Sequence, residues 1–180
     1  MDKNELATEI YKKAHLIGNF LLRSGQKSNE YFDKYLFESD PKILMAIIQE
    51  MKLLVPKDTE VIAGLELGGV PLVTALSIET GLNSVFVRKK AKEYGTCKIA
   101  EGCEIFDKNI CIIEDVVTTG GQIIESVKEL RNRGAKIKNV LCVIQRNSDA
   151  SEILAKENLE LKTVFTMEYI KDIVKKLKKK

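Results

Sequence analysis

Hydrophobic residues recur along the chain in two rhythms, one typical of buried strands and the other of amphipathic helices. Short continuous apolar runs stand at 61–65 (VIAGL), 84–89 (SVFVRK), 109–115 (NICIIED), 139–146 (NVLCVIQR) and 161–166 (LKTVFT). Between them, apolar residues are spaced three and four apart, as in the segment 121–133 that stops at Gly134. Apolar strands that alternate with helices indicate a parallel sheet covered on both faces. The pattern therefore predicts an α/β fold.

The N-terminal part of the chain follows a different pattern. Apolar residues at helical spacing predict an amphipathic helix over residues 3–17. The next stretch, GNFLLRSGQKSNEYFDKYLF, places two apolar segments around a Ser-Gly turn and predicts a hairpin-like pair of strands. Asp40-Pro41 then predicts the start of another helix, with an N-cap followed by proline at the first helical position. Further helices are expected at 149–157 and 169–177.

Residues 89–108, RKKAKEYGTCKIAEGCEIFD, interrupt the alternation of strands and helices. The segment is too polar for a core element and too long for an ordinary connection. Long irregular segments in compact domains are commonly lids or binding loops. We therefore expect a mobile loop here, mainly over residues 89–103.

Composition narrows the class of protein. The 180 residues are 44% hydrophobic and 31% charged, which fits one soluble globular domain with no membrane span. The charged, amphipathic N-terminus argues against a signal peptide. Net charge is +3, but the last six residues carry five lysines, and subtracting these leaves −2 for residues 1–174. The basic character is a tail, so nucleic acid is not an expected partner. The four cysteines form no CxxC pair, and the lone His15, expected on the first helix, is interpreted as structural, so no zinc site is expected. The same cysteine pattern favours a reducing, cytoplasmic location.

The most informative stretch is EDVVTTGGQ, at the junction between the apolar run 109–115 and the helix that follows it. A threonine-glycine turn that opens a helix directs several backbone N–H groups toward one point, which suits a phosphate. Glu114 and Asp115 then serve something adjacent and electron-poor: sugar hydroxyls, a magnesium ion or a ring that develops positive charge. The stretch is neither a Walker loop nor a GxGxxG fingerprint. An acidic strand end with a plain helix cap is the alternative.

Two other strand ends carry comparable signals. LELGGVP, at 65–71, is again a strand, a glycine turn and a helix start, and it predicts either a second phosphate cradle or merely a tight turn. RKKAK, at 88–92, places four cations at a strand end that leads into the polar loop. These cations are either solvated or positioned to close over a polyanion.

Together these motifs resemble those of the type I phosphoribosyltransferases. EDVVTTGG resembles their signature for phosphoribosyl diphosphate, and YFDKYLFESDP, GLELGGVP and RKKAKEYGT are similar to the orotate phosphoribosyltransferase family in particular. The resemblance covers residues 18–146 in the expected order. It implies a five-stranded, mostly parallel sheet with a small hood, mainly residues 1–40 plus a C-terminal part. It also implies transfer of ribose 5-phosphate from phosphoribosyl diphosphate to orotate in pyrimidine biosynthesis, with Mg²⁺, in a homodimer with shared active sites.

The resemblance also implies roles for residues. Lys89, Lys92 and Asp115 are the expected catalytic residues, with Arg88, Lys89 and Lys92 on the leaving diphosphate, partly across subunits. Glu114 and Asp115 hold the ribose hydroxyls, and Arg146 pairs with the orotate carboxylate. The remaining substrate contacts are expected in three groups. Arg23, Tyr31 and Phe32 contact the pyrimidine, and Gly68 and Gly69 contact the diphosphate together with Tyr94. The residues around the 5-phosphate are Val116, Val117, Thr118, Thr119, Gly120, Gly121 and Gln122. No protein metal ligand is expected.

The chain departs from the usual family pattern at four positions. Gly68 stands where many members have a lysine, and Tyr94 where many have a histidine. Arg23 replaces a lysine near the base, and Gly121 replaces a hydroxyl residue. The missing lysine at Gly68 leaves the diphosphate turn without its usual cation, so that charge comes from elsewhere or is absent.

Two other functions share the signature. A purine-type phosphoribosyltransferase carries the same EDVVTTGG motif and stacks its base on a late aromatic residue, a part that Phe165 is available to play. A non-catalytic regulator that senses phosphoribosyl diphosphate is the second alternative, although such proteins carry an added DNA-binding domain.

Overall fold

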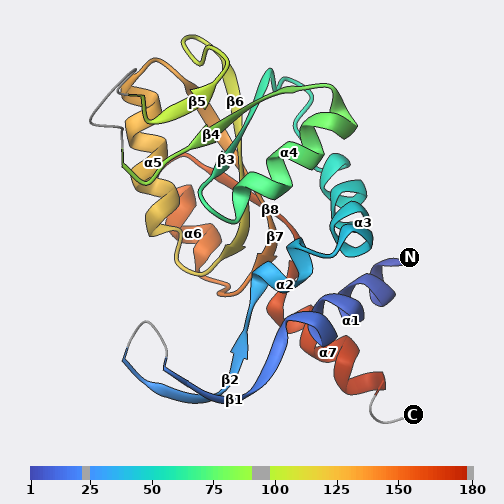
Figure 1. Ribbon diagram of the computed structural model, residues 1–180. Helices are drawn as coiled ribbons and strands as arrows, with labels where there is room; N and C mark the ends of the chain where they lie inside the picture. The colour runs from blue at the N-terminus through green and yellow to red at the C-terminus, as the bar shows by residue number, and fades with distance from the viewer. Residues whose placement is uncertain (22–24, 91–97, 178–180) are drawn as a thin grey trace.

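A central β-sheet organises the chain. The computed structural model describes residues 1–21, 25–90 and 98–177, and within them the sheet has the strand order β5-β4-β3-β6-β7-β8 (Figure 1). All neighbouring strands run parallel except the edge strand β5, which is antiparallel to β4. The fold class expected from the sequence is thereby confirmed. The strands are β3 (Val61–Leu65), β4 (Asn83–Val87), β5 (Ala100–Gly102), β6 (Asn109–Val117), β7 (Lys136–Gln145) and β8 (Glu160–Thr166).

Helices cover both faces of this sheet and bury side chains that alternate along the strands. On one face, Ile62 and Ile113 pack in a core with α1, α3, α4 and α7. On the other, Ala63 and Ile112 pack with α5 and α6. Successive strand residues point to opposite faces, so continuous apolar runs fill both cores. The helices are α1 (Lys3–Ala14), α3 (Pro41–Lys52), α4 (Gly69–Thr80), α5 (Gly121–Asn132), α6 (Ala150–Ala155) and α7 (Met167–Leu177).

An antiparallel hairpin, β1 (His15–Leu21) and β2 (Lys27–Phe32), projects away from the sheet (Figure 1). The expected helix over 3–17 is therefore too long: it ends at Ala14, and His15 begins a strand. Its helical spacing is overridden by pairing, because His15, Leu16 and Ile17 lie opposite Phe32, Tyr31 and Glu30. The hairpin itself was predicted correctly.

A short helix, α2 (Lys34–Glu38), follows the hairpin where the sequence suggested a continuing strand. The side chain of Asp33 caps it by accepting a hydrogen bond from the Tyr35 amide at 3.1 Å. Phe37 anchors it with its side chain fully buried in the core shared with α1 and α3. This helix carries Lys34 and Glu38 toward the sheet, with consequences for the site below.

The segment expected to be one long loop is partly regular. Residues 100–102 form β5, which pairs with β4 through Val85–Val87. Ile99 and Ala100 are buried against the second core, which explains why this polar stretch can close the sheet edge. Residues 91–97 lie outside the described part of the chain.

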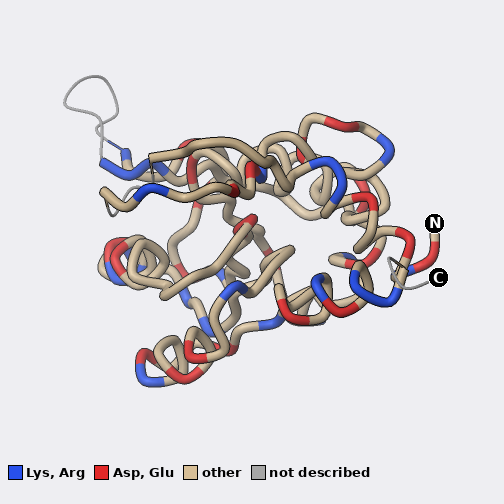
Figure 2. Tube along the Cα trace, turned by 90° about the horizontal axis from the view of Figure 1, so that it is seen from below, with Lys and Arg blue, Asp and Glu red and all other residues tan. Residues whose placement is uncertain are grey.

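Charges of both signs are interspersed around the described trace (Figure 2). Among the described helices, none combines the length and apolar character that a membrane span requires. Cys111 and Cys142 are buried core residues, and burial raises the pKa of each thiol to about 12.

Candidate active site

Two helix N-termini meet at the carboxyl ends of neighbouring strands. β3 leads through a turn into α4, and β6 leads through a turn into α5, while β3 and β6 are paired in parallel. Gly68 and Gly120 occupy the N-cap positions of these helices, and no side chain makes a capping hydrogen bond at either. Uncapped backbone N–H groups and the positive ends of two helix dipoles therefore face the same edge of the sheet. This is suitable geometry for two anionic groups on one ligand.

Backbone geometry makes Gly120 necessary at the second turn. Its φ is +80°, a conformation that side chains disfavour, and a Cβ there would lie 3.0 Å from the Leu154 side chain. Gly121 and Gln122, both exposed, begin α5, and Thr118 and Thr119 are exposed just before it. The predicted phosphate turn is thus accessible to a ligand from the carboxyl end of the sheet.

Glu114 and Asp115 lie at the end of β6 with different surroundings. Asp115 is fully buried, with Oδ1 accepting a hydrogen bond of 2.5 Å from the Val116 amide. Its Oδ2 forms an ion pair of 2.5 Å with Nζ of Lys34, a residue from α2. Among the described residues, neither Oδ2 of Asp115 nor Oε2 of Glu114 receives a well-aligned hydrogen bond. A ligand with hydroxyl groups would satisfy Oε2 of Glu114, and it would satisfy Oδ2 of Asp115 in place of Lys34.

Crowding of carboxyl groups changes their ionisation. Burial, and then the charge of Asp115, raise the pKa of Glu114 to about 8. The same two causes raise the pKa of Glu38, the buried last residue of α2, to about 9. Burial lowers the pKa of the Lys34 ammonium, but the charge of Asp115 and the contact with it outweigh burial and raise it. At neutral pH the cluster therefore holds protonated Glu38, largely protonated Glu114 and charged Lys34.

Cations from the end of β4 lie beside these turns. Arg88, Lys89 and Lys90 line a depression together with Gln122 and Glu125 of α5. The Lys89 amide donates a hydrogen bond of 2.6 Å to Glu66 of the first turn, and its ammonium lowers the pKa of Glu114, against the larger effect of burial. Nε of Arg88 lies 3.4 Å from Oε1 of Glu101 on β5. The strand end thus brings positive charge to both helix N-termini.

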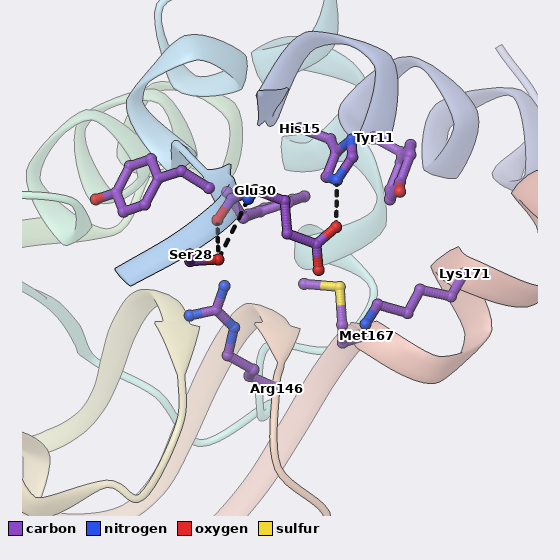
Figure 3. A pocket seen from close by; sticks show the side chains of 9 residues that line it. Tyr11, His15, Ser28, Glu30, Arg146, Met167 and Lys171 are labelled. Atoms are coloured by element: carbon purple, nitrogen blue, oxygen red, sulfur yellow. Dashed lines mark hydrogen bonds and ion pairs between the residues drawn. The ribbon is translucent and has the colours of Figure 1, made fainter. Parts of the chain in front are cut away.

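A separate cavity of about 330 Å³ lies between the hairpin and the carboxyl end of β7 (Figure 3). Tyr31 and Phe32 of β2 line it, and Arg146 extends its guanidinium toward the strand (Figure 3). The structure thus brings together three residues that the sequence assigned to one base. Phe32 packs against Phe37 with ring centroids 6.4 Å apart, which fixes this wall of the cavity to the core.

The same cavity contains residues that the sequence reading missed. Nε2 of His15 lies 2.8 Å from Oε2 of Glu30, and the His15 ring stacks on Tyr11 at a centroid distance of 4.5 Å. The hydrogen bond with His15 and the charge of His15 lower the pKa of Glu30. The charge of Lys171 on α7 lowers it further. Alternation along β2, with Ser28, Glu30 and Phe32 on one side, was the signal that could have found Glu30.

Several predicted site residues cannot be placed. Arg23, Lys92 and Tyr94 lie outside the described residues, so their roles stay predictions. Gly68 and Gly69 lie at the first turn, where the Glu66–Leu67 peptide bond is cis. Val116 and Val117 are the last residues of β6, the first half-buried and the second buried.

A mostly parallel sheet with two uncapped glycine-turn helix N-termini and an adjoining cavity is suited to binding a phosphorylated sugar. Residues 38–170 match the family described as Phosphoribosyl transferase domain. The orotate phosphoribosyltransferase of Nocardioides sp. is 48% identical over 161 residues, which cover 89% of this chain and 90% of that protein. That of Methanocaldococcus jannaschii is 38% identical, covering 93% and 96%. The chain therefore belongs to the phosphoribosyltransferase family, within its orotate phosphoribosyltransferase branch.

Solved structures agree with this assignment. The orotate phosphoribosyltransferase of Mycobacterium tuberculosis H37Rv, in complex with Fe(III) dicitrate, superposes with a TM-score of 0.85 at 27% identity, covering 94% of this chain and 99% of that one. The same enzyme in complex with 5-phospho-α-D-ribosyl 1-diphosphate gives a TM-score of 0.80 at 25% identity, covering 94% and 99%. An adenine phosphoribosyltransferase from Leishmania tarentolae, at 14% identity and a TM-score of 0.67, shares the fold alone.

Proposed function

We propose that this protein transfers ribose 5-phosphate from phosphoribosyl diphosphate to N1 of orotate, forming orotidine 5′-monophosphate and diphosphate. The C1′–O bond to diphosphate breaks with its electron pair leaving on the diphosphate, the bond from N1 to C1′ forms, and N1 gives up its proton. The ribose passes through an oxocarbenium-like state, so the enzyme needs positioning and charge rather than a covalent nucleophile. The two uncapped helix N-termini and the carboxylates between them meet that need.

The observation that carries the choice of orotate is Arg146 in the cavity with Tyr31 and Phe32. A guanidinium can bind a carboxylate through two parallel hydrogen bonds, which a base without a carboxylate cannot form. The Arg146 amide is hydrogen-bonded to the Val117 carbonyl at 2.8 Å, so the cavity adjoins the end of β6. A base held by Arg146 would therefore lie beside a sugar held at Glu114 and Asp115.

The sugar and its two anionic groups are assigned to the remaining parts of the site. The α5 N-terminus with Thr118 and Thr119 would hold the 5-phosphate, and the Gly68 turn would hold the diphosphate. Glu114 and Asp115 would accept hydrogen bonds from the ribose hydroxyls through the oxygens that lack aligned donors. Arg88 and Lys89 would neutralise the leaving group, with Lys92 as a further expected contributor.

Magnesium is expected to arrive on the substrate. Among the described residues, no group of three or more His, Cys, Asp or Glu side chains is arranged to hold a metal ion. Mg²⁺ commonly keeps several waters and binds substrate phosphates with few protein ligands, so this site fits an ion carried by the diphosphate. There it would offset the negative charge of the leaving group.

The purine-type phosphoribosyltransferase alternative requires an aromatic residue that stacks on the base, and Phe165 is not available for this role. Phe165 is 2% exposed and lies in the core, stacked on Tyr169 with centroids 5.8 Å apart, so it has no face available for a base. The regulator alternative has no comparable observation in its favour, since the relatives cited above are enzymes. We retain orotate as the substrate.

We further propose one domain that acts as a homodimer in the cytoplasm, with Arg88 and the loop after it contributing to the partner's site. The exposed side chains of Lys89 and Lys90 at the start of that loop are compatible with reaching another subunit. The described cysteines Cys103, Cys111 and Cys142 are free, as in a reducing compartment. Nucleic acid and membranes are not proposed as partners.

The test is substrate choice by the purified protein. With phosphoribosyl diphosphate and Mg²⁺, we expect consumption of orotate and release of diphosphate, and no consumption of adenine, guanine or hypoxanthine. Turnover of hypoxanthine without turnover of orotate would refute the proposal. Chelation of Mg²⁺ with EDTA should abolish the reaction, and added Mg²⁺ should restore it.

A further inference from the structure

Lys34 is a cation in the candidate site that stands within YFDKYLFESDP but to which the sequence motifs assign no role. It is the first residue of α2, directly after the hairpin and its capping residue Asp33. Its side chain is 32% exposed, whereas that of its partner Asp115 is 0% exposed. Nζ also lies 5.3 Å from the centroid of the Tyr35 ring. One side of the ammonium is thus held by the buried carboxylate, while the remainder of the side chain is open to solvent.

The carboxylate that holds Lys34 lies directly over the Gly68 turn. A Cβ built on Gly68 would be 1.4 Å from Oδ2 of Asp115, the same oxygen that Nζ of Lys34 approaches to 2.5 Å. No side chain of any kind can therefore occupy position 68 in this arrangement. Because both distances end on one oxygen, Nζ lies next to the place where a side chain on Gly68 would begin.

The turn itself supplies no positive side chain. Its residues are Glu66, Leu67, Gly68 and Gly69, and the one ionisable group among them is an acid. A diphosphate bound there would find backbone N–H groups but would lack an adjacent cation from the turn. Lys34 is one described cation beside this position, and Lys89 at the end of β4 is another.

We propose that Lys34 is a diphosphate-binding cation of the Gly68 turn. It pairs with Asp115 while the site is empty and moves to the diphosphate when that group binds. In the full substrate, the ribose hydroxyls then take its place on Asp115. This inference rests on the proposed function, which supplies the sugar and the diphosphate. It assigns a binding role to a residue contributed by the hairpin side of the site.

The geometry of the ion pair favours such an exchange. Oδ2 receives no well-aligned hydrogen bond among the described residues despite the short separation from Nζ, so the contact is an ion pair that a directed donor can replace. A ribose hydroxyl can donate to that oxygen without adding charge. While the ammonium rests on Asp115 it is charged, since the charge of Asp115 and the contact with it outweigh burial and raise its pKa. A displaced, half-exposed lysine has only to rotate to meet a diphosphate oxygen.

The experiment is isothermal titration calorimetry in Mg²⁺ buffer with three ligands: phosphoribosyl diphosphate, inorganic diphosphate and ribose 5-phosphate. The variants are Lys34→Met, Lys34→Gln and Lys34→Arg, with Lys57→Met as the control at an exposed lysine between α3 and β3. We expect Lys34→Met and Lys34→Gln to weaken both diphosphate ligands at least tenfold and ribose 5-phosphate less than twofold. Lys34→Arg should recover part of the loss, and Lys57→Met should match the wild type.

Ligand selectivity separates this role from a structural one. If Lys34 merely holds Asp115 in place, its loss will weaken ribose 5-phosphate as much as phosphoribosyl diphosphate, and the inference is overturned. Unchanged affinity for diphosphate in a wild-type-like Lys34→Gln protein overturns it equally. The Lys34→Gln side chain keeps a hydrogen-bond donor beside Asp115, so this variant can still be measured if Lys34→Met does not fold. A wild-type protein that bound neither diphosphate ligand would refute the proposed function as well. If the wild type binds both ligands and the Lys34 variants bind them equally well, this inference alone is refuted.

Discussion

The backbone amide of Arg146 donates a hydrogen bond of 2.8 Å to the carbonyl of Val117. This bond joins the residue after β7 to the last residue of β6, the strand that carries Glu114 and Asp115. The side chain of Arg146 thereby enters the base cavity from a point fixed relative to the sugar site. Base and sugar positions are set by the same two strand ends.

Removal of the Arg146 side chain tests the base assignment. We expect Arg146→Ala to lower kcat/KM for orotate about 100-fold, because hydrogen bonds to charged groups contribute about 1.5–3 kcal/mol and each ~1.4 kcal/mol is a factor of ten. Arg146→Lys should fall between the two, since it keeps charge but loses the planar pair of donors. Steady-state kinetics with orotate varied at saturating phosphoribosyl diphosphate measures both. Normal orotate affinity in Arg146→Ala would remove the carboxylate pairing from the proposal.

Gly120 and Gly81 form a matched pair for testing the phosphate turn. Both have positive φ, +80° and +75°, but a Cβ on Gly120 meets Leu154 at 3.0 Å while one on Gly81 meets nothing within 4 Å. Each alanine variant should lose about 1–2 kcal/mol of unfolding free energy from the left-handed backbone. Gly120→Ala should in addition raise KM for phosphoribosyl diphosphate at least tenfold, whereas Gly81→Ala, at the far end of α4, should leave it unchanged. Equal kinetic effects of the two variants would argue against a phosphate cradle at Gly120.

The buried carboxyl of Glu38 makes stability depend on pH. Its folded-state pKa of about 9 exceeds the ordinary 4.5, so the native state holds a proton that the unfolded state has released between those values. This contribution is fully present below pH 4.5 and is lost as pH rises toward 9, with a slope of about 1.4 kcal/mol per pH unit. We expect Glu38→Gln to reduce the decline in unfolding free energy between pH 6 and pH 9, measured by urea denaturation.

Glu60 provides the control for that measurement. Hydrogen bonds from the Asn109 amide and from Lys108 lower its pKa, so any stability from this group is present above the ordinary pKa and is lost as pH falls through the lowered one. Glu60→Gln should therefore leave the slope between pH 6 and pH 9 as in the wild type. Parallel curves for Glu38→Gln and the wild type would mean that Glu38 is ionised in the native protein.

Mixing inactive variants tests sharing between subunits. Arg88→Ala and Asp115→Ala should each be nearly inactive alone. If Arg88 acts in the partner's site, random 1:1 reassociation yields mixed dimers in which one site carries both defects and the other carries none, giving about a quarter of wild-type activity. Activity that stays at the level of the separate variants would place Arg88 in its own subunit's site.

How far the sequence predicted this molecule depended on whether each signal was local. The strand at 61–65 and the helix ending before Gly134 follow from apolar runs and a terminating glycine, which neighbouring residues determine. The turn between β6 and α5 was equally readable, because Asp115 and Gly120 lie within a few residues of each other. His15 was misplaced on a helix, since the spacing of Ala14 and Ile17 suits one and only the pairing with β2 overrides it.

The rest of the site could not be predicted because tertiary structure assembles it. Lys34 and Glu38 reach Asp115 only through a short helix whose sequence resembles a strand. Both stand in YFDKYLFESDP, but that motif alone assigns them no role. Glu30 and Lys171 share a cavity through the meeting of the hairpin with α7. Phe165 was weighed as a base-stacking residue, although its place on an apolar strand was consistent with the buried position that it occupies.

The proposed function assigns the two halves of the substrate to different portions of the polypeptide. The base cavity is built from residues 11–32 and 146–171, near opposite ends of the chain, which are clasped where the Tyr169 hydroxyl donates to Oδ1 of Asn4 at 2.6 Å. The phosphate turns come from the uninterrupted middle. An ancestor could thus have exchanged one nucleobase for another by altering its flanks, leaving the inherited grip on the sugar donor untouched.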